Sequence, residues 1–217
     1  ATGVWTQAGA HPPIPYTRGV GGSPNCKDPR DERVYCATYA TAERFDGTTN
    51  SWTRVIDRSQ LGESAQDVAI MGIDTVHNKL FRLGLTGTGG YLTPGTMDLT
   101  SLAYTRVATL VGPYASTFPV GSPNAYIGGA GLCFDPGLGK FLLYRAYGDD
   151  GFIYTFEYVS DLQWRCDRLT LAGTPPPIDQ SASRGYFLGG SMQYCQELGG
   201  FAIIKRADLN VYFVKTV

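Results

Sequence analysis

The sequence is poor in charge and in histidine, and it has no long apolar run. Charged residues make up 17% of the 217 residues, with 18 Lys and Arg against 19 Asp and Glu, so the formal net charge is -1. A chain so close to neutrality has no electrostatic attraction for nucleic acid. No stretch approaches the roughly 20 apolar residues of a membrane-spanning helix. The low charge also argues against a long solvated helix or a disordered tail.

Signals for secretion are missing as well. The chain begins Ala1-Thr2 without a signal peptide, and no Asn has Ser or Thr two places further on. The location stays open: a virion and the cytoplasm are both compatible with these signals, and cleavage of a longer precursor would leave the same first residues. The five cysteines are odd in number and form no C-x-x-C motif, which favours free thiols in a reduced compartment. Cys26 and Cys36 could still pair across a hairpin under oxidising conditions.

Residues for catalysis or metal binding are not arranged in known patterns. The two histidines, His11 and His77, lie beside no G-x-S-x-G elbow, and His77 falls in a predicted turn. Asp149-Asp150-Gly151 is typical of a hairpin turn and lacks the rest of a calcium loop. The glycine-rich run Gly84–Gly90 lacks the Lys-Ser/Thr of a phosphate-binding loop. We therefore expect no catalytic residue, no metal site formed by side chains and no cofactor.

Gly (28), Pro (13) and Tyr (14) are plentiful, as in chains of short strands joined by tight turns. An aromatic-led segment recurs at positions 5, 52, 104 and 164, at intervals of 47, 52 and 60 residues: Trp5-Thr6-Gln7, Trp52-Thr53-Arg54, Tyr104-Thr105-Arg106 and Trp164-Arg165-Cys166. Repeats of about 40–50 residues with several strands each are typical of β-propellers. Nothing before residue 5 could complete its own repeat, and no such segment follows the last repeat. We therefore expect the N-terminal strand to complete the last blade.

Each repeat divides into strand-like runs, which we call a to d from the axis outwards. The predicted runs are 17–22, 33–39, 42–45 and 51–58 in the first repeat; 67–76, 79–85, 96–99 and 103–110 in the second; 125–134, 140–147, 152–159 and 163–171 in the third; and 185–195, 201–205 and 210–217 in the fourth, with 4–8 as its missing run d. The a-to-b turns support this register, because Ile73-Asp74, Phe134-Asp135 and Tyr194-Cys195 recur 61 and then 60 residues apart. Diglycines in run a (Gly21-Gly22, Gly128-Gly129 and Gly189-Gly190) suit the crowding of innermost strands around an axis.

One segment carries a family resemblance. The run Arg44-Phe45-Asp46-Gly47-Thr48-Thr49-Asn50-Ser51-Trp52 resembles the kelch repeat, in which an aromatic-Asp pair leads through a polar turn to a Trp. Arg18, just before Gly21-Gly22, also fits that pattern, whereas the second and third repeats depart from it. Kelch propellers more often have about five to seven blades, so four blades imply a tight ring or half of a larger assembly.

We predict an all-β, single-domain fold over residues 1–217: a four-bladed β-propeller of four-stranded antiparallel blades, closed by the N-terminal strand. Its blades span about 17–58, 67–110, 125–171 and 185–217 plus 4–8. Closure removes two exposed sheet edges, which invite aggregation. The aromatics of run d should pack between blades, so Trp52→Ala is expected to cost about 3–5 kcal/mol. Backbone carbonyls in a narrow channel could hold an ion without any sequence signature.

The connections from run d to the next run a should gather on one face of the disc. They are 11–16, 59–65, 113–124 and 174–183, and two of them are rich in proline. Rigid loops that carry aromatics suit a protein-binding face. The candidate residues are Tyr16, Arg18, Tyr114, Phe118, Pro176 and Arg184.

The expected function is a non-catalytic structural or protein-binding module. One concrete version is a virion-surface or phage decoration or adhesion protein whose partner is a capsid or cell-surface protein. Two alternatives stay open at this point. A carbohydrate-binding lectin would repeat its pocket residues in every blade, and a hydrolase or lyase would need a cluster at the channel mouth, for which Arg18, Asp67 and Arg184 are the nearest candidates.

Overall fold

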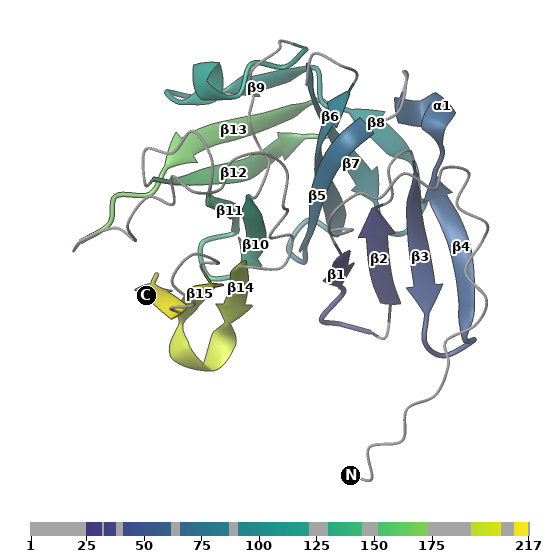
Figure 1. Ribbon diagram of the computed structural model, residues 1–217, viewed down its shortest axis with the longest axis horizontal. Coiled ribbons are helices and arrows are strands. Elements are labelled where there is room, and N and C mark those ends of the chain that lie inside the picture. The colour runs from purple at the N-terminus through teal and green to yellow at the C-terminus, as the bar shows by residue number, and fades with distance from the viewer. Residues whose placement is uncertain are drawn as a thin grey trace, which may run out of the picture.

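The computed structural model describes residues 25–31, 33–37, 41–61, 66–86, 91–121, 130–144, 152–172, 192–204 and 211–216. These residues form an all-β structure of four sheets that follow one another along the chain (Figure 1). Apart from the strands, they form one short helical turn, α1 (Arg58–Leu61), and two 3-10 turns, η1 (Ala115–Thr117) and η2 (Gln196–Leu198).

Each sheet is an up-and-down meander of neighbouring strands. The first sheet contains β1 (Asn25–Lys27), β2 (Arg33–Ala37), β3 (Ala42–Asp46) and β4 (Ser51–Ile56); the second contains β5 (Gln66–Asp74), β6 (Lys79–Thr86), β7 (Tyr91–Asp98) and β8 (Tyr104–Arg106). The third contains β10 (Gly131–Asp135), β11 (Lys140–Tyr144), β12 (Ile153–Ser160), β13 (Gln163–Arg168) and the added β9 (Thr109–Val111); the fourth contains β14 (Met192–Cys195), β15 (Gly200–Ile204) and β16 (Val211–Lys215). Most of the predicted runs coincide with these strands.

The first strand of the first sheet differs from the prediction. β1 (25–27) pairs with β2, whereas the predicted run a was 17–22, which lies outside the described residues. The turn after β1 begins at Asp28, just as the turns after β5 and β10 begin at Asp74 and Asp135. The sequence prediction did not include this first copy of the turn.

The predicted run d of the second repeat, 103–110, is split between two sheets. β8 pairs antiparallel with β7, and the chain then crosses to the third sheet, where β9 pairs in parallel with β13. The third sheet therefore has five strands and is not purely antiparallel, contrary to the prediction. The segment between β8 and β9 is stabilised by the carbonyl oxygen of Leu162. This oxygen accepts hydrogen bonds from the amides of Ala108 (2.8 Å) and Thr109 (3.3 Å).

The first strands of the four sheets lie beside one another. β5 contacts both β1 and β10, and β10 contacts β14. In Figure 1 these strands lie towards the middle of the molecule, and the later strands of each sheet extend outwards. This is a propeller-like arrangement of sheets. The predicted strand 4–8 lies outside the described residues, so its pairing with β16 stays a prediction.

Three apolar clusters fill the spaces between successive sheets, because alternate residues of each strand face opposite neighbours. In the second sheet, Leu80 faces the first sheet while Phe81 faces the third. The cluster between the second and third sheets is rich in aromatic rings, among them the fully buried Trp164. Trp52, for which deep burial was predicted, is instead partly exposed.

Candidate functional site

An aspartate-led turn recurs at one end of the sheets. Asp28, Asp74 and Asp135 each end or follow a first strand, are at most 2% exposed, and accept hydrogen bonds from backbone amides two or three residues ahead. Such side-chain-to-backbone bonds stabilise tight turns. These buried carboxylates therefore serve the turns themselves.

Five residues after each of these aspartates, a basic residue begins the second strand and pairs with a carboxylate on the third strand. The pairs are Arg33–Asp46 (3.9 Å), Lys79–Asp98 (3.1 Å) and Lys140–Glu157 (3.1 Å). Sequence reasoning missed this repeat, although Asp-x4-Lys/Arg is visible in three repeats. Cross-strand charge pairs of this kind stabilise a sheet.

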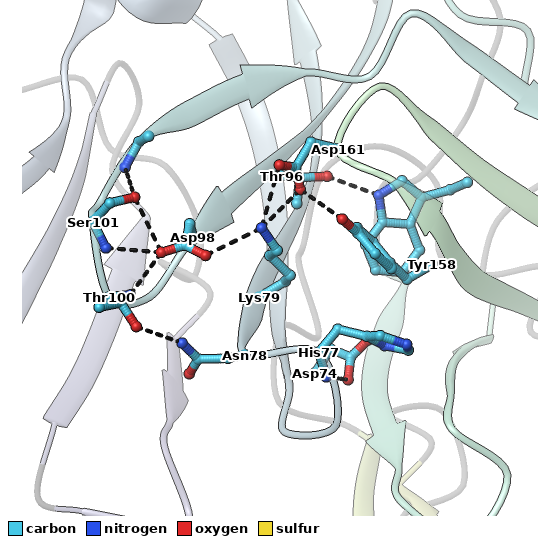
Figure 2. Close-up of polar contacts among 12 residues, drawn as sticks. Asp74, His77, Asn78, Lys79, Thr96, Asp98, Thr100, Ser101, Tyr158 and Asp161 are labelled. Carbon is cyan, nitrogen blue, oxygen red and sulfur yellow. Dashed lines mark hydrogen bonds and ion pairs between the residues drawn. The ribbon is translucent and has the colours of Figure 1, made fainter.

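A polar cluster of described residues joins the second and third sheets around Lys79 (Figure 2). Its Nζ lies 3.1 Å from Asp98 Oδ2 in its own sheet and 2.9 Å from Asp161 Oδ1, in the turn between β12 and β13. The hydroxyl of Tyr158 donates a hydrogen bond of 3.0 Å to Asp161. Because the Lys79 side chain is only 12% exposed, this is a partly desolvated ion-pair network between two sheets.

His77 extends the cluster. Its Nδ1 lies 2.7 Å from Oδ2 of Asp74, whose side chain is fully buried, and its ring lies on that of Tyr158 with centroids 4.8 Å apart. Figure 2 shows this pair below the lysine. A histidine oriented by a carboxylate can act as a general base when a nucleophile lies within hydrogen-bond reach. Among the side chains drawn around it, Tyr158 meets His77 ring against ring and directs its hydroxyl to Asp161.

The pKa shifts in the cluster fix its charges at neutral pH. Hydrogen bonds from the Ser101 amide and from Lys79 lower the pKa of Asp98 to about 2. Burial opposes the charge of Lys79, but its hydrogen bonds to Asp161 and Asp98 outweigh burial and raise the lysine pKa. Burial and the bond to Asp161 raise the pKa of Tyr158. The lysine therefore stays protonated, Asp98 ionised and the phenol neutral, which suits structural ion pairing better than proton transfer.

All five cysteines are free thiols, and four of them are held in their neutral form. Burial is the main cause that raises the pKa of Cys26, Cys36, Cys133 and Cys166, so they lack the thiolate that a nucleophile needs. Cys26 pairs with Tyr35 in the β1–β2 register, so Cys36 points to the opposite face of the sheet. The hairpin disulfide that the sequence left open does not fit this register.

Three exposed apolar residues are sequence neighbours of residues in the Lys79 cluster. Val76 (58% exposed), Val159 (50%) and Leu162 (56%) are next to His77, Tyr158 and Asp161 in the chain. We call Val76, His77, Tyr158, Val159 and Leu162 the rim surface. Its turns are held by backbone and ionic bonds, so these apolar side chains sit on a rigid support.

The predicted binding-face residues are only partly placed. Tyr114 is half-buried, and the guanidinium of Arg168 lies 4.9 Å from its ring and 3.9 Å from that of Phe152. Phe118 is fully buried, edge-on to Tyr154, so its predicted contact with a partner is wrong. Four predicted binding-face residues lie outside the described residues: Tyr16, Arg18, Pro176 and Arg184. So do the loops 11–16 and 174–183. The three diglycines and the predicted hairpin turn lie there too: Gly21-Gly22, Gly128-Gly129, Gly189-Gly190 and Asp149-Asp150-Gly151.

Two further features are absent from the described ranges. Within them, no helix has the length and apolar character needed to cross a membrane. The same ranges bring together no group of three or more His, Cys, Asp or Glu side chains able to hold a metal ion.

Comparisons with known proteins give a limited result. No family model matches the chain, and no curated protein matches it by sequence. Among solved structures, TolB from Acinetobacter baumannii is similar over 88% of this chain and 40% of its own, with 12% identity and a TM-score of 0.46. An auxiliary nutrient binding protein from Bacteroides thetaiotaomicron VPI-5482 is similar over 90% of this chain and 42% of its own, with 10% identity and a TM-score of 0.47. The chain thus spans about two-fifths of the length of either protein.

Proposed function

We propose that this chain is a non-catalytic, protein-binding module. Its fold is a four-bladed, kelch-like β-propeller closed by residues 4–8, which add a fourth strand to β16. The rim surface supports the binding role, because it presents exposed apolar side chains on turns that are held by hydrogen bonds and ion pairs. Such exposed apolar groups on a rigid scaffold are typical of protein interfaces.

The strand count supports the closure. The fourth strands of the first three sheets carry an aromatic residue opposite the third strand: Trp52 opposite Phe45, Tyr104 opposite Met97, and Trp164 opposite Tyr158. The fourth sheet has three described strands and ends at β16. Trp5, within residues 4–8, would supply the corresponding aromatic, and the added strand would cover an edge that otherwise invites aggregation.

The protonation states support the absence of catalysis at this site. A nucleophile or general base works best with a pKa near the working pH. Around Lys79 the pKa values move away from neutral pH. The pKa of Asp98 is lowered and that of Lys79 is raised. The buried thiols are likewise held in their neutral form.

Charge indicates what kind of partner surface fits. Asp161 and Asp98 are 44% and 29% exposed, whereas the lysine between them is 12% exposed. The carboxylates are thus more accessible than the ammonium group. We propose a partner that places a basic side chain beside apolar ones, and a capsid or cell-surface protein is the concrete case we favour.

The test is co-purification from the native source with a tagged chain and matched variants. The double variant Val76→Ser/Leu162→Ser should lose the partner that the unaltered chain retains. Leu198→Ser removes an equally exposed apolar side chain (61%) from η2, away from the rim, and should retain it. Equal retention by both variants, or elution of the bound material by simple sugars, would contradict the proposal.

A further inference from the structure

We propose that Arg168 and the aromatic rings around it form a binding site for a carboxylate group attached to an apolar body. The site lies where β13 ends, beside Tyr114 and Phe152. The turn at Asp161 and the rim surface lie at the opposite end of the β12–β13 hairpin, about 20 Å away for strands of this length. The site is therefore distinct from the surface on which the proposed function depends.

Two aromatic rings hold the guanidinium of Arg168 in place. Its Cζ lies over both rings, 3.9 Å from the centroid of Phe152 and 4.9 Å from that of Tyr114. Both rings pack in turn on the apolar cluster between the second and third sheets, and Tyr114 meets Tyr154 edge-on, with centroids 6.2 Å apart. Tyr154 is also the cross-strand neighbour of Arg168. The core of the fold therefore gives this arginine a rigid aromatic support.

The positive charge of Arg168 forms no ion pair among the described residues. Its neighbour Asp167 accepts a hydrogen bond from the backbone amide of Arg168 (2.8 Å), and the other carboxylate oxygen lies 3.9 Å from the guanidinium of Arg165. Alternate residues of a strand point to opposite faces, so the Asp167 side chain points away from that of Arg168. Arg168 is only partly exposed, so its charge is partly removed from water without a carboxylate in exchange.

The position of the guanidinium over the rings leaves its hydrogen-bond donors available. An arginine side chain carries five N–H donors, all in the plane of the guanidinium. Contact with the face of an aromatic ring uses the flat side of the guanidinium, so the donors at its edge can still bind a ligand. A carboxylate accepts two of these hydrogen bonds at once. The chemistry of Arg168 therefore fits a carboxylate.

The rings indicate what the carboxylate is attached to. Tyr114 and Phe152 are both partly exposed beside the arginine. An apolar body attached to the carboxylate can pack on the exposed part of these rings while the acid group pairs with Arg168. Because the rings and the guanidinium already support one another, little of this part of the chain has to be ordered when the ligand binds.

A nuclear magnetic resonance titration with benzoate tests this site. The Nε–H signal of Arg168, identified by its absence from Arg168→Lys, should shift until it saturates, with a Kd of about 1–20 mM. Arg168→Gln removes the charge and should weaken binding by about tenfold or more, as followed by the backbone amides of residues 168 and 169. If the glutamine variant unfolds, Arg168→Lys keeps the charge without the planar fork and should weaken binding by about threefold or more.

Two controls accompany the titration. Arg165→Gln alters an arginine of the same strand whose side chain is 50% exposed, and it should bind benzoate like the unaltered chain. Benzamide is the uncharged counterpart of benzoate and should cause no saturable shift.

Three results would overturn the inference. The first is a benzoate shift as large at Arg165 as at Arg168, which would mean an adventitious ion only. The second is binding of benzamide as tight as that of benzoate. The third is unchanged benzoate binding by Arg168→Lys and Arg168→Gln.

Co-purification from the native source distinguishes two origins of the carboxylate. Loss of a protein partner from Arg168→Gln assigns the carboxylate to an acidic side chain of that partner, whereas its retention assigns it to a free organic acid. The variant Val76→Ser/Leu162→Ser keeps Arg168 and should bind benzoate unchanged, so this inference and the proposed function fail independently.

Discussion

The indole of Trp164, in the third sheet, is stacked on the ring of Phe81, in the second, with centroids 4.1 Å apart. The same indole donates a hydrogen bond of 2.8 Å to the hydroxyl of Thr96, also in the second sheet. One fully buried side chain thus combines apolar packing with a satisfied polar group across the boundary between two sheets. Together with the β8–β9 crossing, it links the second and third sheets.

Trp164 should therefore contribute more to stability than Trp52. We expect Trp164→Ala to lower the free energy of unfolding by about 3–5 kcal/mol, because it opens a large buried cavity and leaves Thr96 without its donor. Trp52→Ala, at a partly exposed site, should cost about 1–2 kcal/mol, less than the sequence alone suggested. Urea denaturation of both variants checks this, and equal losses would contradict it.

Gly95 should not tolerate a side chain. A Cβ at this position would overlap the phenol of Tyr104, whose hydroxyl accepts a hydrogen bond from the buried guanidinium of Arg82. We expect Gly95→Ala to displace the Tyr104 ring and to destabilise the fold by about 1–3 kcal/mol. The same substitution at exposed Gly121 meets no atom within 4 Å, although its positive φ of 69° adds some strain. Thermal unfolding should therefore show the larger loss at Gly95.

Asp98 should make the fold sensitive to acid. Its pKa is lowered to about 2 in the folded state, below its ordinary value of 3.8, so its ionised form stabilises the fold above about pH 4. That contribution is lost as the pH falls from about 4 towards 2. Asp98→Asn should flatten this part of the stability–pH curve, measured by urea midpoints at several pH values. An unchanged slope between pH 4 and 2 would show that Asp98 does not carry this effect.

The buried thiols should resist alkylation. Burial raises the pKa of Cys166 to about 12, so its thiolate fraction at pH 8 should be roughly 1000-fold below that of an unfolded cysteine. Cys195 is partly exposed and should react with iodoacetamide first. Mass spectrometry of native and urea-unfolded protein distinguishes the sites. Rapid native modification of Cys166 would contradict this account of its surroundings.

The strands were predictable where the signal is local. Alternating apolar residues and turn residues located β2 to β4, β6 and β11 to β13 within a few positions, because neighbouring strands of a meander pair through short turns. The turn at Asp28 carries the same local signal and would have located β1, whereas the predicted run 17–22 lies outside the described residues.

The remaining features depend on contacts between distant residues. β9 pairs in parallel with β13 although Thr109 and Gln163 lie 54 residues apart, and no local pattern records such a pairing. Phe118 was placed on a binding loop, yet its ring is buried between aromatic residues of β12. The Lys79 cluster was missed for the same reason, since Asp161 reaches it from another sheet.

Ring closure is the central claim, and a distance between the chain ends tests it most directly. Spin labels can be attached to non-natural amino acids at positions 6 and 215, so that the five cysteines stay unlabelled. Pulsed electron paramagnetic resonance then measures the distance between the two labels. Neighbouring strands lie about 5 Å apart, so closure predicts one narrow distribution below about 20 Å, allowing for the label arms. A broad distribution centred well beyond that distance would show that the first strand does not pair with β16 and would contradict the closed propeller.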